Sequence, residues 1–219
     1  MCIRDRSYPQ FNFSKNEIGY FEPGAGYLFP EKCIDVQLKL AKNNGAAIIL
    51  NQEVLDISDS SSGVLVKIKD RTILAENVIV CAGAWVSNFI PKEVKEYLKI
   101  YRQVLYWFEP KGDSQSFLPS KFPVYIRIGK TLEDTFYGFP AIDGSSGGIK
   151  LALEQYTSTC TPDTLNKTVT TQEVDEVFQN ISPFLNIKNS CVKSLSCMYT
   201  VTPDSHFVID KHPESENKL

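Results

Sequence analysis

The chain has 219 residues, of which 42% are apolar and 22% charged, and its formal net charge is −3. These values are typical of a globular protein with a sizeable core, built as one large domain or two small ones. Lysines and arginines are mixed with acids, which argues against a nucleic-acid or anionic-membrane partner, and the apolar runs are too short to span a bilayer.

The two ends of the chain differ in character from its middle. Residues 1–7, MCIRDRS, resemble translated adapter sequence, so we expect a non-native head and exclude it from the fold. The polar end HPESENKL is expected to be a truncated end, although NKL faintly resembles the peroxisomal signal SKL. The expectation is an internal fragment of a cytoplasmic protein, or of a peroxisomal one if the source is a eukaryote.

The cysteines do not form a recognisable disulfide or zinc pattern. There are six, without a CxxC pair and without a secretory signal before them. Cys191 and Cys197 are expected on one face of one strand, about 20 Å apart, which is too far for a disulfide. A reducing compartment fits this pattern. Two histidines and scattered thiols show no ligand spacing, so no metal site is predicted.

The first half of the chain predicts alternating helix and strand. A helix is expected to begin after Pro30 and to end at Gly45, with apolar residues at helical spacing between them. Residues 46–50, AAIIL, are then predicted to form a short buried strand. The segments EVLDI, VLVKIKD and RTILAENVIVCAGAW predict hairpin strands that lead into a continuous apolar strand. This order is typical of the later half of a nucleotide-binding α/β domain, which places ligands at the carboxyl ends of its strands.

After Pro91 the predicted strands become aromatic and are separated by turns, which favours a mostly antiparallel sheet in a second domain. These strands are YRQVLYWFEP, FPVYIRIG, TFYGFPAI, GGIKLALEQY and CVKSLSCMYTVTP. One helix interrupts them. The segment TTQEVDEVFQNISPFL opens with a capping box from Thr170 to Glu173 and carries a single apolar stripe.

Several segments together resemble the monomeric sarcosine oxidase and N-methyltryptophan oxidase family of FAD-dependent amine oxidases, in the family's order. The matching segments are AGYLFPE, VIVCAGAWVSNFIP, YRQVLYWFEP, YGFPAIDG, GGIKLALEQY, TPDTLNKTV and CMYTVTPDSHFVIDKHPE. The last segment is the most specific, because it contains the family's flavin-linking cysteine. The chain departs from the family in having neither the GxGxxG loop that holds the FAD pyrophosphate nor the glycine- and lysine-containing block beside the flavin.

The resemblance implies an α/β plus α+β fold, with a partial FAD-binding Rossmann-like domain and an antiparallel-sheet substrate domain. The expected boundaries after the head are 8–27 for a substrate-domain lead-in, 28–90 for part of the FAD-binding domain, 91–195 for the substrate domain, and 196–219 for a return into the FAD-binding domain.

Cys197 and Lys150 are the two residues with the most specific implied roles. From composition alone Cys197 reads as a small buried thiol. The family's matching cysteine forms a thioether with the flavin, through attack of a thiolate on an electron-poor ring methyl carbon, which raises the flavin's oxidising power. Lys150 alternates with apolar neighbours on its strand, so it reads as a solvated side chain or, as the resemblance implies, as a cation that promotes the reaction of reduced flavin with oxygen.

Four further residues take implied roles from the same strands. Tyr137 is expected to line the substrate pocket, and Tyr199 and Thr200 to lie beside the flavin, although strand aromatics more often belong to a core. Sarcosine oxidases often have a histidine four residues after the sheet lysine, where this chain has Glu154. If Glu154 faces the cavity, it favours a substrate with a cationic or hydrogen-bonding side group; otherwise it is solvent-exposed.

The segment around CAGAW is a place where a cofactor could approach the backbone closely. Ala82, Gly83 and Trp85 follow a predicted buried strand, where small residues allow a tight turn and also a close approach of the cofactor. His206 and His212 have no acid or nucleophile at a recognisable spacing, so both are interpreted as structural. No Ser-His-Asp or paired-carboxylate set is present.

The resemblance implies an FAD-dependent oxidase that oxidises the C–N bond of a secondary amine, an N-methyl amino acid of the sarcosine or N-methyltryptophan type. Oxygen would be the acceptor, giving hydrogen peroxide and an aldehyde, and the enzyme would act as a monomer. The fragment itself is expected to bind FAD weakly or not at all and to be inactive. Two alternatives stay open: a dehydrogenase of the wider D-amino-acid oxidase superfamily with another electron acceptor, and a non-catalytic binding module on the same fold.

Overall fold

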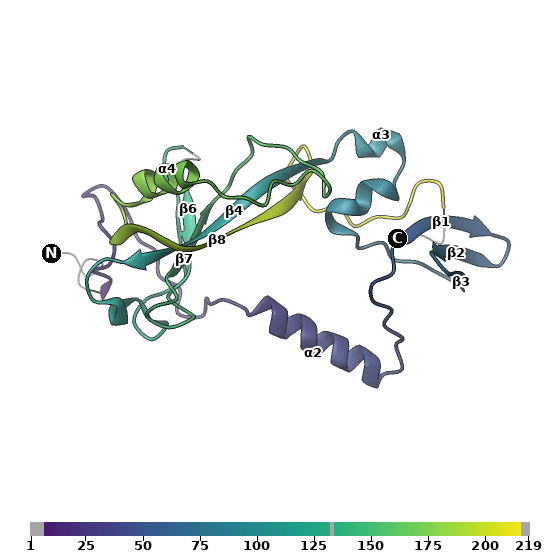
Figure 1. Ribbon diagram of the computed structural model, residues 1–219, viewed down its shortest axis with the longest axis horizontal. Coiled ribbons are helices and arrows are strands. Elements are labelled where there is room, and N and C mark those ends of the chain that lie inside the picture. The colour runs from purple at the N-terminus through teal and green to yellow at the C-terminus, as the bar shows by residue number, and fades with distance from the viewer. Residues whose placement is uncertain (1–6, 132–133, 216–219) are drawn as a thin grey trace. The chain divides into compact units, whose positions relative to one another are not determined.

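The computed structural model describes residues 7–131 and 134–215 (Figure 1). The expected head, apart from Ser7, and the NKL end lie outside the described residues. The helices of the described part are α2 (Pro30–Asn43), α3 (Lys92–Lys95) and α4 (Thr171–Ile181), with 3₁₀ helices η1 (Gly83–Asn88) and η2 (Ser114–Phe117). Its strands are β1 (Val54–Ser60), β2 (Gly63–Ile68), β3 (Arg71–Ala75), β4 (Lys99–Pro110), β5 (Tyr125–Arg127), β6 (Phe136–Gly138), β7 (Ile149–Leu153) and β8 (Ile187–Val201).

The described chain divides into two compact units, each assembled from separate stretches of sequence. The sheet unit contains the residues up to Tyr27, together with Tyr101–Cys160 and Thr164–Met198. The hairpin unit contains Leu28–Ile100, Thr161–Asp163 and the residues from Tyr199 onward.

The sheet unit is built on a five-stranded sheet with the order β5-β6-β7-β4-β8. β4 pairs antiparallel with β7, β6 with β7, and β5 with β6. The antiparallel sheet predicted from the aromatic strands is therefore confirmed. Because side chains alternate along a strand, β7 turns Ile149 and Leu151 toward one face and Lys150 toward the other.

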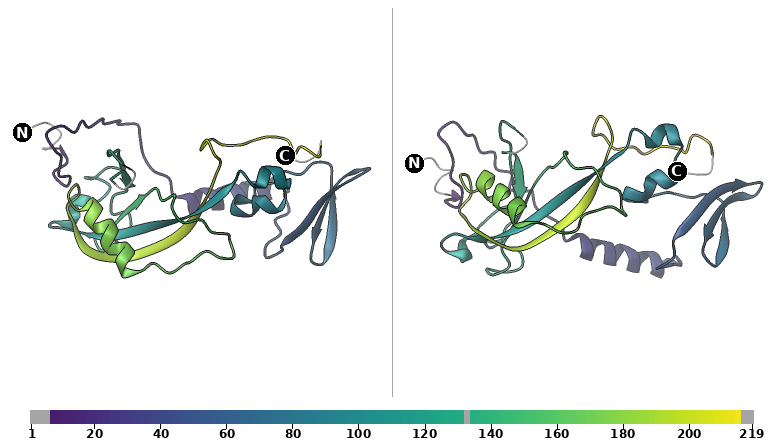
Figure 2. Two further views of the ribbon diagram at one scale, coloured as in Figure 1. Left: turned by 90° about the horizontal axis from the view of Figure 1, so that it is seen from above. Right: turned by 45° about the horizontal axis from the view of Figure 1, so that its top comes forward.

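The core of the sheet unit lies on the Ile149 and Leu151 face, under α4 (Figures 1 and 2). The capping box predicted for α4 is present: the Thr170 hydroxyl accepts from the Glu173 backbone N–H, and the Glu173 carboxylate accepts from the Thr170 N–H. The predicted apolar stripe packs on the core, where Ile181 is fully buried. A capped helix with one apolar face therefore closes one side of the sheet.

The expected lead-in at 8–27 docks on this core. The Asn12 N–H donates to the Phe184 carbonyl over 2.8 Å, and the Phe11 ring lies 4.9 Å from that of Phe122. Arg127 binds the Glu17 carboxylate through Nε at 3.0 Å and Nη2 at 2.8 Å. The lead-in is therefore attached by both apolar and charged contacts.

The hairpin unit contains the antiparallel meander β1-β2-β3. The predicted hairpin strands are confirmed here. The β1–β2 turn requires a glycine, because Gly63 has φ +136° and an added Cβ would lie 2.3 Å from the Ala75 carbonyl oxygen. The helix predicted after Pro30 is also confirmed as α2, and Gly45 follows its C-cap with φ +91°.

Two strand predictions in this unit are wrong. Residues 46–50 have no strand conformation, and Ile49 and Leu50 are 44% and 70% exposed. Residues 79–82 also lack strand conformation, and the chain enters η1 at Gly83. A short apolar run becomes a buried strand only when neighbouring strands hydrogen-bond to it, and the described part of the unit supplies no such neighbours for these residues.

The apolar face of α2 is also uncovered. None of its residues is buried, and both further views show it connected to β1 by an extended segment rather than lying on the meander (Figure 2). The apolar spacing predicted the helix correctly. The spacing does not determine whether another part of the chain packs against the apolar face of the helix.

Candidate active site

Lys150 lies in a row of aromatic residues on the face of the sheet opposite the core. Its strand partner on β4 is Trp107, and on the other side the Phe139 N–H donates to the Lys150 carbonyl over 2.8 Å. The Lys150 ammonium lies 5.0 Å from the centroid of the Phe139 ring and 5.5 Å from that of Trp107. Both distances fall within the range of cation–π attraction.

Cys197 lies on β8, which neighbours β4 in the sheet, and its side chain is half-buried. Burial raises the pKa of the Cys197 thiol, and the Lys150 ammonium acts in the opposite direction by favouring the thiolate. The net direction is upward. The two residues with the most specific expected roles therefore lie in the same five-stranded sheet, on β7 and β8.

Tyr137 belongs to the same surface. It pairs with Ala152 in the β6–β7 ladder, and its ring meets that of Phe139 edge-on at 6.3 Å between centroids. The predicted alternation places Ala152 on the Lys150 face. Glu154, directly after β7, is exposed and accepts a hydrogen bond of 2.9 Å from the Tyr156 hydroxyl.

The remaining expected site residues lie in the hairpin unit. Tyr199 and Thr200 continue β8 beyond Met198 and are exposed. Ala82 caps η1, and Trp85, inside η1, is 50% exposed. Gly83 has φ +52°, and an added Cβ would meet no atom within 4 Å, so its backbone conformation and open surroundings suit a close approach by a ligand.

Sequence reasoning missed Trp107 and Phe139 as members of the lysine's surroundings. Trp107 is 9% exposed and reads in the sequence as one more aromatic core residue of YRQVLYWFEP. Its partner Lys150 becomes evident only from the register of β4 against β7. The signal that could have found it is alternation: Tyr106 and Phe108 are core residues, which leaves Trp107 for the other face.

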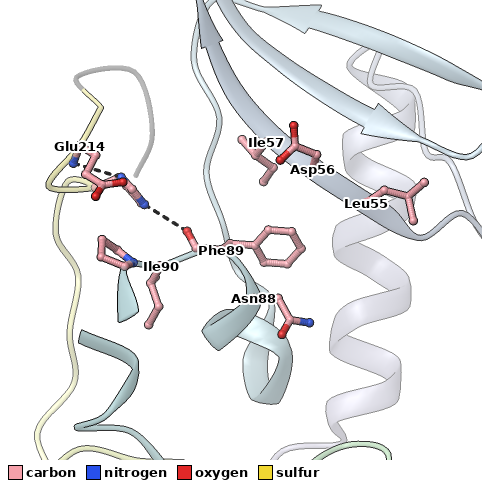
Figure 3. Close-up of a pocket in the computed structure, with 9 residues that line it drawn as sticks. Leu55, Asp56, Ile57, Asn88, Phe89, Ile90 and Glu214 are labelled. Atoms are coloured by element: carbon pink, nitrogen blue, oxygen red, sulfur yellow. Dashed lines mark hydrogen bonds between the residues drawn. The ribbon is translucent and has the colours of Figure 1, made fainter. Parts of the chain in front are cut away.

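The two histidines lie in the C-terminal segment of the hairpin unit. His206 is exposed, and its Nδ1 lies 3.4 Å from the Asp204 carboxylate, an acid that the sequence had not indicated as its partner. His212 is held at both nitrogens. Its Nε2 lies 3.1 Å from the Phe89 carbonyl oxygen, and its Nδ1 accepts from the Glu214 N–H over 3.2 Å (Figure 3). These two bonds tie the ring to the residues after η1 and to its own segment.

His212 is one of nine residues that line a cavity of about 200 Å³ in the hairpin unit (Figure 3). The lining residues come from β1, from the end of η1 and the residues after it, and from the C-terminal segment: Leu55, Asp56, Ile57, Asn88, Phe89, Ile90, Pro91, His212 and Glu214. None of the site residues expected from the sequence lines it. Both ring nitrogens of His212 are engaged in holding the segment, which gives this histidine a structural role.

Within 7–131 and 134–215, no cluster of three or more His, Cys, Asp or Glu side chains could hold a metal ion. Over the same residues, no helix has the length and apolar character needed to cross a membrane.

The described structure therefore has an antiparallel sheet that carries Lys150 on β7 and Cys197 on β8. The family model of the FAD dependent oxidoreductases, DAO, matches residues 4–218. The chain therefore belongs to the FAD dependent oxidoreductase family.

Curated relatives of the chain include sarcosine oxidases and N-methyl-L-tryptophan oxidases. It is 33% identical over 213 residues to a monomeric sarcosine oxidase from Streptomyces avermitilis, covering 95% of this chain and 54% of that protein. It is 29% identical over 217 residues to an N-methyl-L-tryptophan oxidase from Escherichia coli, covering 97% of this chain and 55% of that protein. The chain thus spans about half the length of the curated relatives it matches.

Solved structures show the same fold at lower sequence identity. An L-proline dehydrogenase from P. horikoshii superposes with a TM-score of 0.73 at 16% identity, over 98% of this chain and 55% of that one. Amadoriase I from Aspergillus fumigatus gives a TM-score of 0.68 at 17% identity, over 90% and 47%. These likenesses establish the fold class.

The side chains gathered around Lys150 fit the ring system of a flavin. An ammonium between the faces of two aromatic rings suits the plane of an electron-poor aromatic cofactor. Cys197, a half-buried thiol, lies on β8 of the same sheet.

Proposed function

We propose that the protein containing this chain is an FAD-dependent oxidase of secondary amines, with an N-methyl amino acid of the sarcosine or N-methyltryptophan type as substrate. Oxygen is the electron acceptor, and the products are hydrogen peroxide, an aldehyde and the demethylated amine. The observation that carries this proposal is the Lys150 ammonium held beside the rings of Trp107 and Phe139, in the sheet whose strand β8 carries Cys197. The curated names of the relatives support the choice of substrate.

The flavin, when bound, supplies the redox chemistry by accepting a hydride equivalent from the carbon next to the amine nitrogen and passing electrons to oxygen. We propose that Cys197 carries the flavin as a thioether. Lys150 provides a fixed positive charge where negative charge develops on oxygen, which is electrostatic preorganisation. Its amine is held on the sheet by the rings of Trp107 and Phe139, so the charge needs little reorganisation when oxygen arrives.

Tyr137 and Glu154 are proposed to act on the substrate. Tyr137 offers an aromatic wall and a hydroxyl on the Lys150 face. Glu154, which accepts a hydrogen bond from Tyr156, is proposed to select a cationic or hydrogen-bonding side group. Tyr199 and Thr200, together with Ala82, Gly83 and Trp85, are proposed to lie against the cofactor. The working form is proposed to be a monomer.

The full-length protein tests this proposal directly. Its peptide containing Cys197 is expected to have the mass of a flavin adduct, and oxygen uptake with N-methyl amino acids is expected to match peroxide formed. Lys150→Met is expected to slow oxygen uptake at least tenfold while the adduct remains, because one preorganised charge contributes on this scale. Lys188→Met removes an exposed lysine that binds Glu109 and serves as the matched control.

Three outcomes contradict the proposal in different ways. A bare Cys197 peptide and a protein without flavin would reject the cofactor and leave a binding module. Substrate oxidation without peroxide, but with reduction of an added carrier, would identify a dehydrogenase. Equal oxygen uptake by the Lys150→Met and Lys188→Met variants would remove Lys150 from the reaction with oxygen.

A further inference from the structure

The described part of the hairpin unit has very little hydrophobic core. Of the 19 buried apolar residues in the described chain, only Val64, Ile68 and Ala84 belong to this unit, and all the others lie in the sheet unit. The hairpin unit nevertheless contains Leu28–Ile100 and the residues from Tyr199 onward. A domain of such length ordinarily buries about 60% or more of the surface that its unfolded chain exposes. The apolar side chains of the hairpin unit are present, but most of them are not buried.

The helix α2 shows this exposure most clearly. Ile34 and Leu38 lie on one side of its apolar face, and Val36 and Leu40 lie on the other, so that apolar residues occupy roughly half of the helix circumference. Each of these four side chains is between 43% and 56% exposed. A helix with so wide an apolar face ordinarily packs against more than one neighbour, because burial of that face is what stabilises it.

Two extended segments of the same unit, residues 46–50 and 79–82, are exposed in the same way. Ile49 and Leu50 are 44% and 70% exposed, and Ile79 is 68% exposed. A single exposed apolar residue is ordinary on a protein surface, whereas many of them in one unit indicate a surface that another molecule or chain segment covers. We refer to the exposed apolar residues of α2 and of these two segments as the uncovered residues.

The charges on α2 favour a protein surface over lipid as the cover. The helix carries Glu31 and Asp35 as well as Lys39 and Lys42, and the Lys39 ammonium is paired with the Asp35 carboxylate over 2.6 Å. A helix that lies on a membrane surface instead carries an excess of lysine and arginine on its polar face. Mixed charges around an apolar face are typical of a helix that packs within a globular protein.

The length of the relatives indicates which protein surface this is. The chain covers 54% of the sarcosine oxidase from Streptomyces avermitilis and 55% of the N-methyl-L-tryptophan oxidase from Escherichia coli, so nearly half of each relative lies outside the match. A polypeptide of that length has apolar side chains of its own to bury. The core of the sheet unit is already closed by α4, whereas the hairpin unit offers open apolar surface.

We infer that the uncovered residues are a docking surface for the remainder of a longer polypeptide, the part that the relatives have and this chain does not span. The remainder completes the core of the hairpin unit, so this unit reaches its full stability only in the full-length protein. The sheet unit, with its own closed core, is equally stable with and without the remainder. Docking requires neither substrate nor the proposed reaction, so it can be tested separately from the proposed function.

Two native cysteines report on this surface, since Cys33 lies on α2 and Cys81 lies in the segment 79–82. The experiment measures alkylation of each cysteine by N-ethylmaleimide in the 219-residue chain and in the full-length protein, with the peptides resolved by mass spectrometry. Cys33 and Cys81 are expected to react about tenfold or more slowly in the full-length protein, because a covered thiol reacts only when the surface opens. Cys191, in the sheet unit, is the internal reference and is expected to react within about twofold of the same rate in both.

A substitution on the surface tests docking in the full-length protein alone. Leu38→Gln places an amide in the covered apolar contact and is expected to lower the thermal midpoint by about 3 °C or more and to speed alkylation of Cys33. In the 219-residue chain the same substitution is expected to change the midpoint by about 1 °C or less, because glutamine favours helix nearly as well as leucine. Ile18→Gln, at a side chain of the sheet unit that is 97% exposed, is the matched control and is expected to have little effect in either protein.

Three results overturn the proposal. Equal alkylation of Cys33 and Cys81 in both proteins would show that the surface stays open. Slow alkylation in the 219-residue chain that becomes faster on dilution would identify a second copy as the cover. Binding of the full-length protein to anionic vesicles that Leu38→Gln abolishes would identify lipid.

The full-length comparison also decides the case in which the 219-residue chain does not fold, which rapid alkylation of Cys191 would reveal. Equal thermal midpoints for Leu38→Gln and Ile18→Gln in the full-length protein would then reject the docking surface. A full-length protein that docks in this way but holds no flavin would reject the proposed function and leave this result intact.

Discussion

The sheet unit and the hairpin unit use similar apolar patterns with opposite results. In the sheet unit the apolar stripe of α4 meets a five-stranded sheet, and Ile181 and Leu151 are both fully buried. In the hairpin unit the apolar stripe of α2 remains uncovered, and Ile34 and Leu40 are 55% and 56% exposed. The difference shows that an amphipathic pattern predicts a helix, whereas its burial depends on which surface the rest of the chain supplies.

The largest effect is expected from a substitution in the core that α4 covers. Ile181→Ala should lower the free energy of unfolding of the sheet unit by about 2–5 kcal/mol, because it leaves a cavity in a packed core. Ile34→Ala, on the uncovered face of α2, should change it by about 0.5 kcal/mol or less, since little surface is buried and alanine favours helix. Urea denaturation followed by circular dichroism measures both. Equal effects would show that α2 is covered in solution.

The capping box at the start of α4 should make a smaller, pH-dependent contribution to the free energy of unfolding. Burial raises the pKa of the Glu173 carboxyl, but hydrogen bonds from Thr170 and the charge of Arg102 lower it, and the net direction is downward. A lowered pKa in the folded state means that the stabilisation is present above the ordinary carboxyl pKa and is lost as pH falls through the folded value.

Glu173→Gln should therefore cost about 1 kcal/mol near neutral pH and nothing in acid, where the carboxyl is protonated. Glu176→Gln is the matched control, because Glu176 is exposed and accepts only from Gln172 among the bonds described. Denaturation midpoints over a range of acidic to neutral pH measure the effect. A constant difference between Glu173→Gln and the unmodified chain at all pH values would contradict it.

The third prediction concerns the hairpin unit, where polar contacts hold the C-terminal segment. His212→Ala removes the bond to the Phe89 carbonyl and the acceptor for the Glu214 N–H, which should cost about 1 kcal/mol in local stability. Hydrogen exchange at the Glu214 amide should accelerate accordingly. His206→Ala, at a side chain that is 83% exposed, should leave that amide unchanged. Similar acceleration in both variants would show that His212 does not fasten the segment.

The smallest expected effect lies on the surface of α2. Lys39 and Asp35 form an exposed i,i+4 ion pair of 2.6 Å. Lys39→Ala should weaken the helix by about 0.3 kcal/mol at low salt, and added salt should remove the difference. Helicity measured by circular dichroism at two salt concentrations tests this. A loss that persists in high salt would point to a covered rather than an exposed helix.

Local sequence patterns were sufficient to predict most of the regular elements and part of the candidate site. The capping box at Thr170, the glycine after α2 and the alternation around Lys150 act over a few residues, so they can be read directly from the chain. They located α4, the end of α2 and the solvent side of β7. Residues 46–50 were misread, because a short apolar run carries no information about whether neighbouring strands are present.

The sequence by itself determined α2, α4, the meander and the aromatic antiparallel strands, because these depend on spacing, capping and turn residues close together in the chain. Only the tertiary structure decided that Trp107, Phe139 and Lys150 stand side by side. The physical reason is strand register: a slip of one residue would turn every one of these side chains to the other face, and register is fixed by pairing between distant segments.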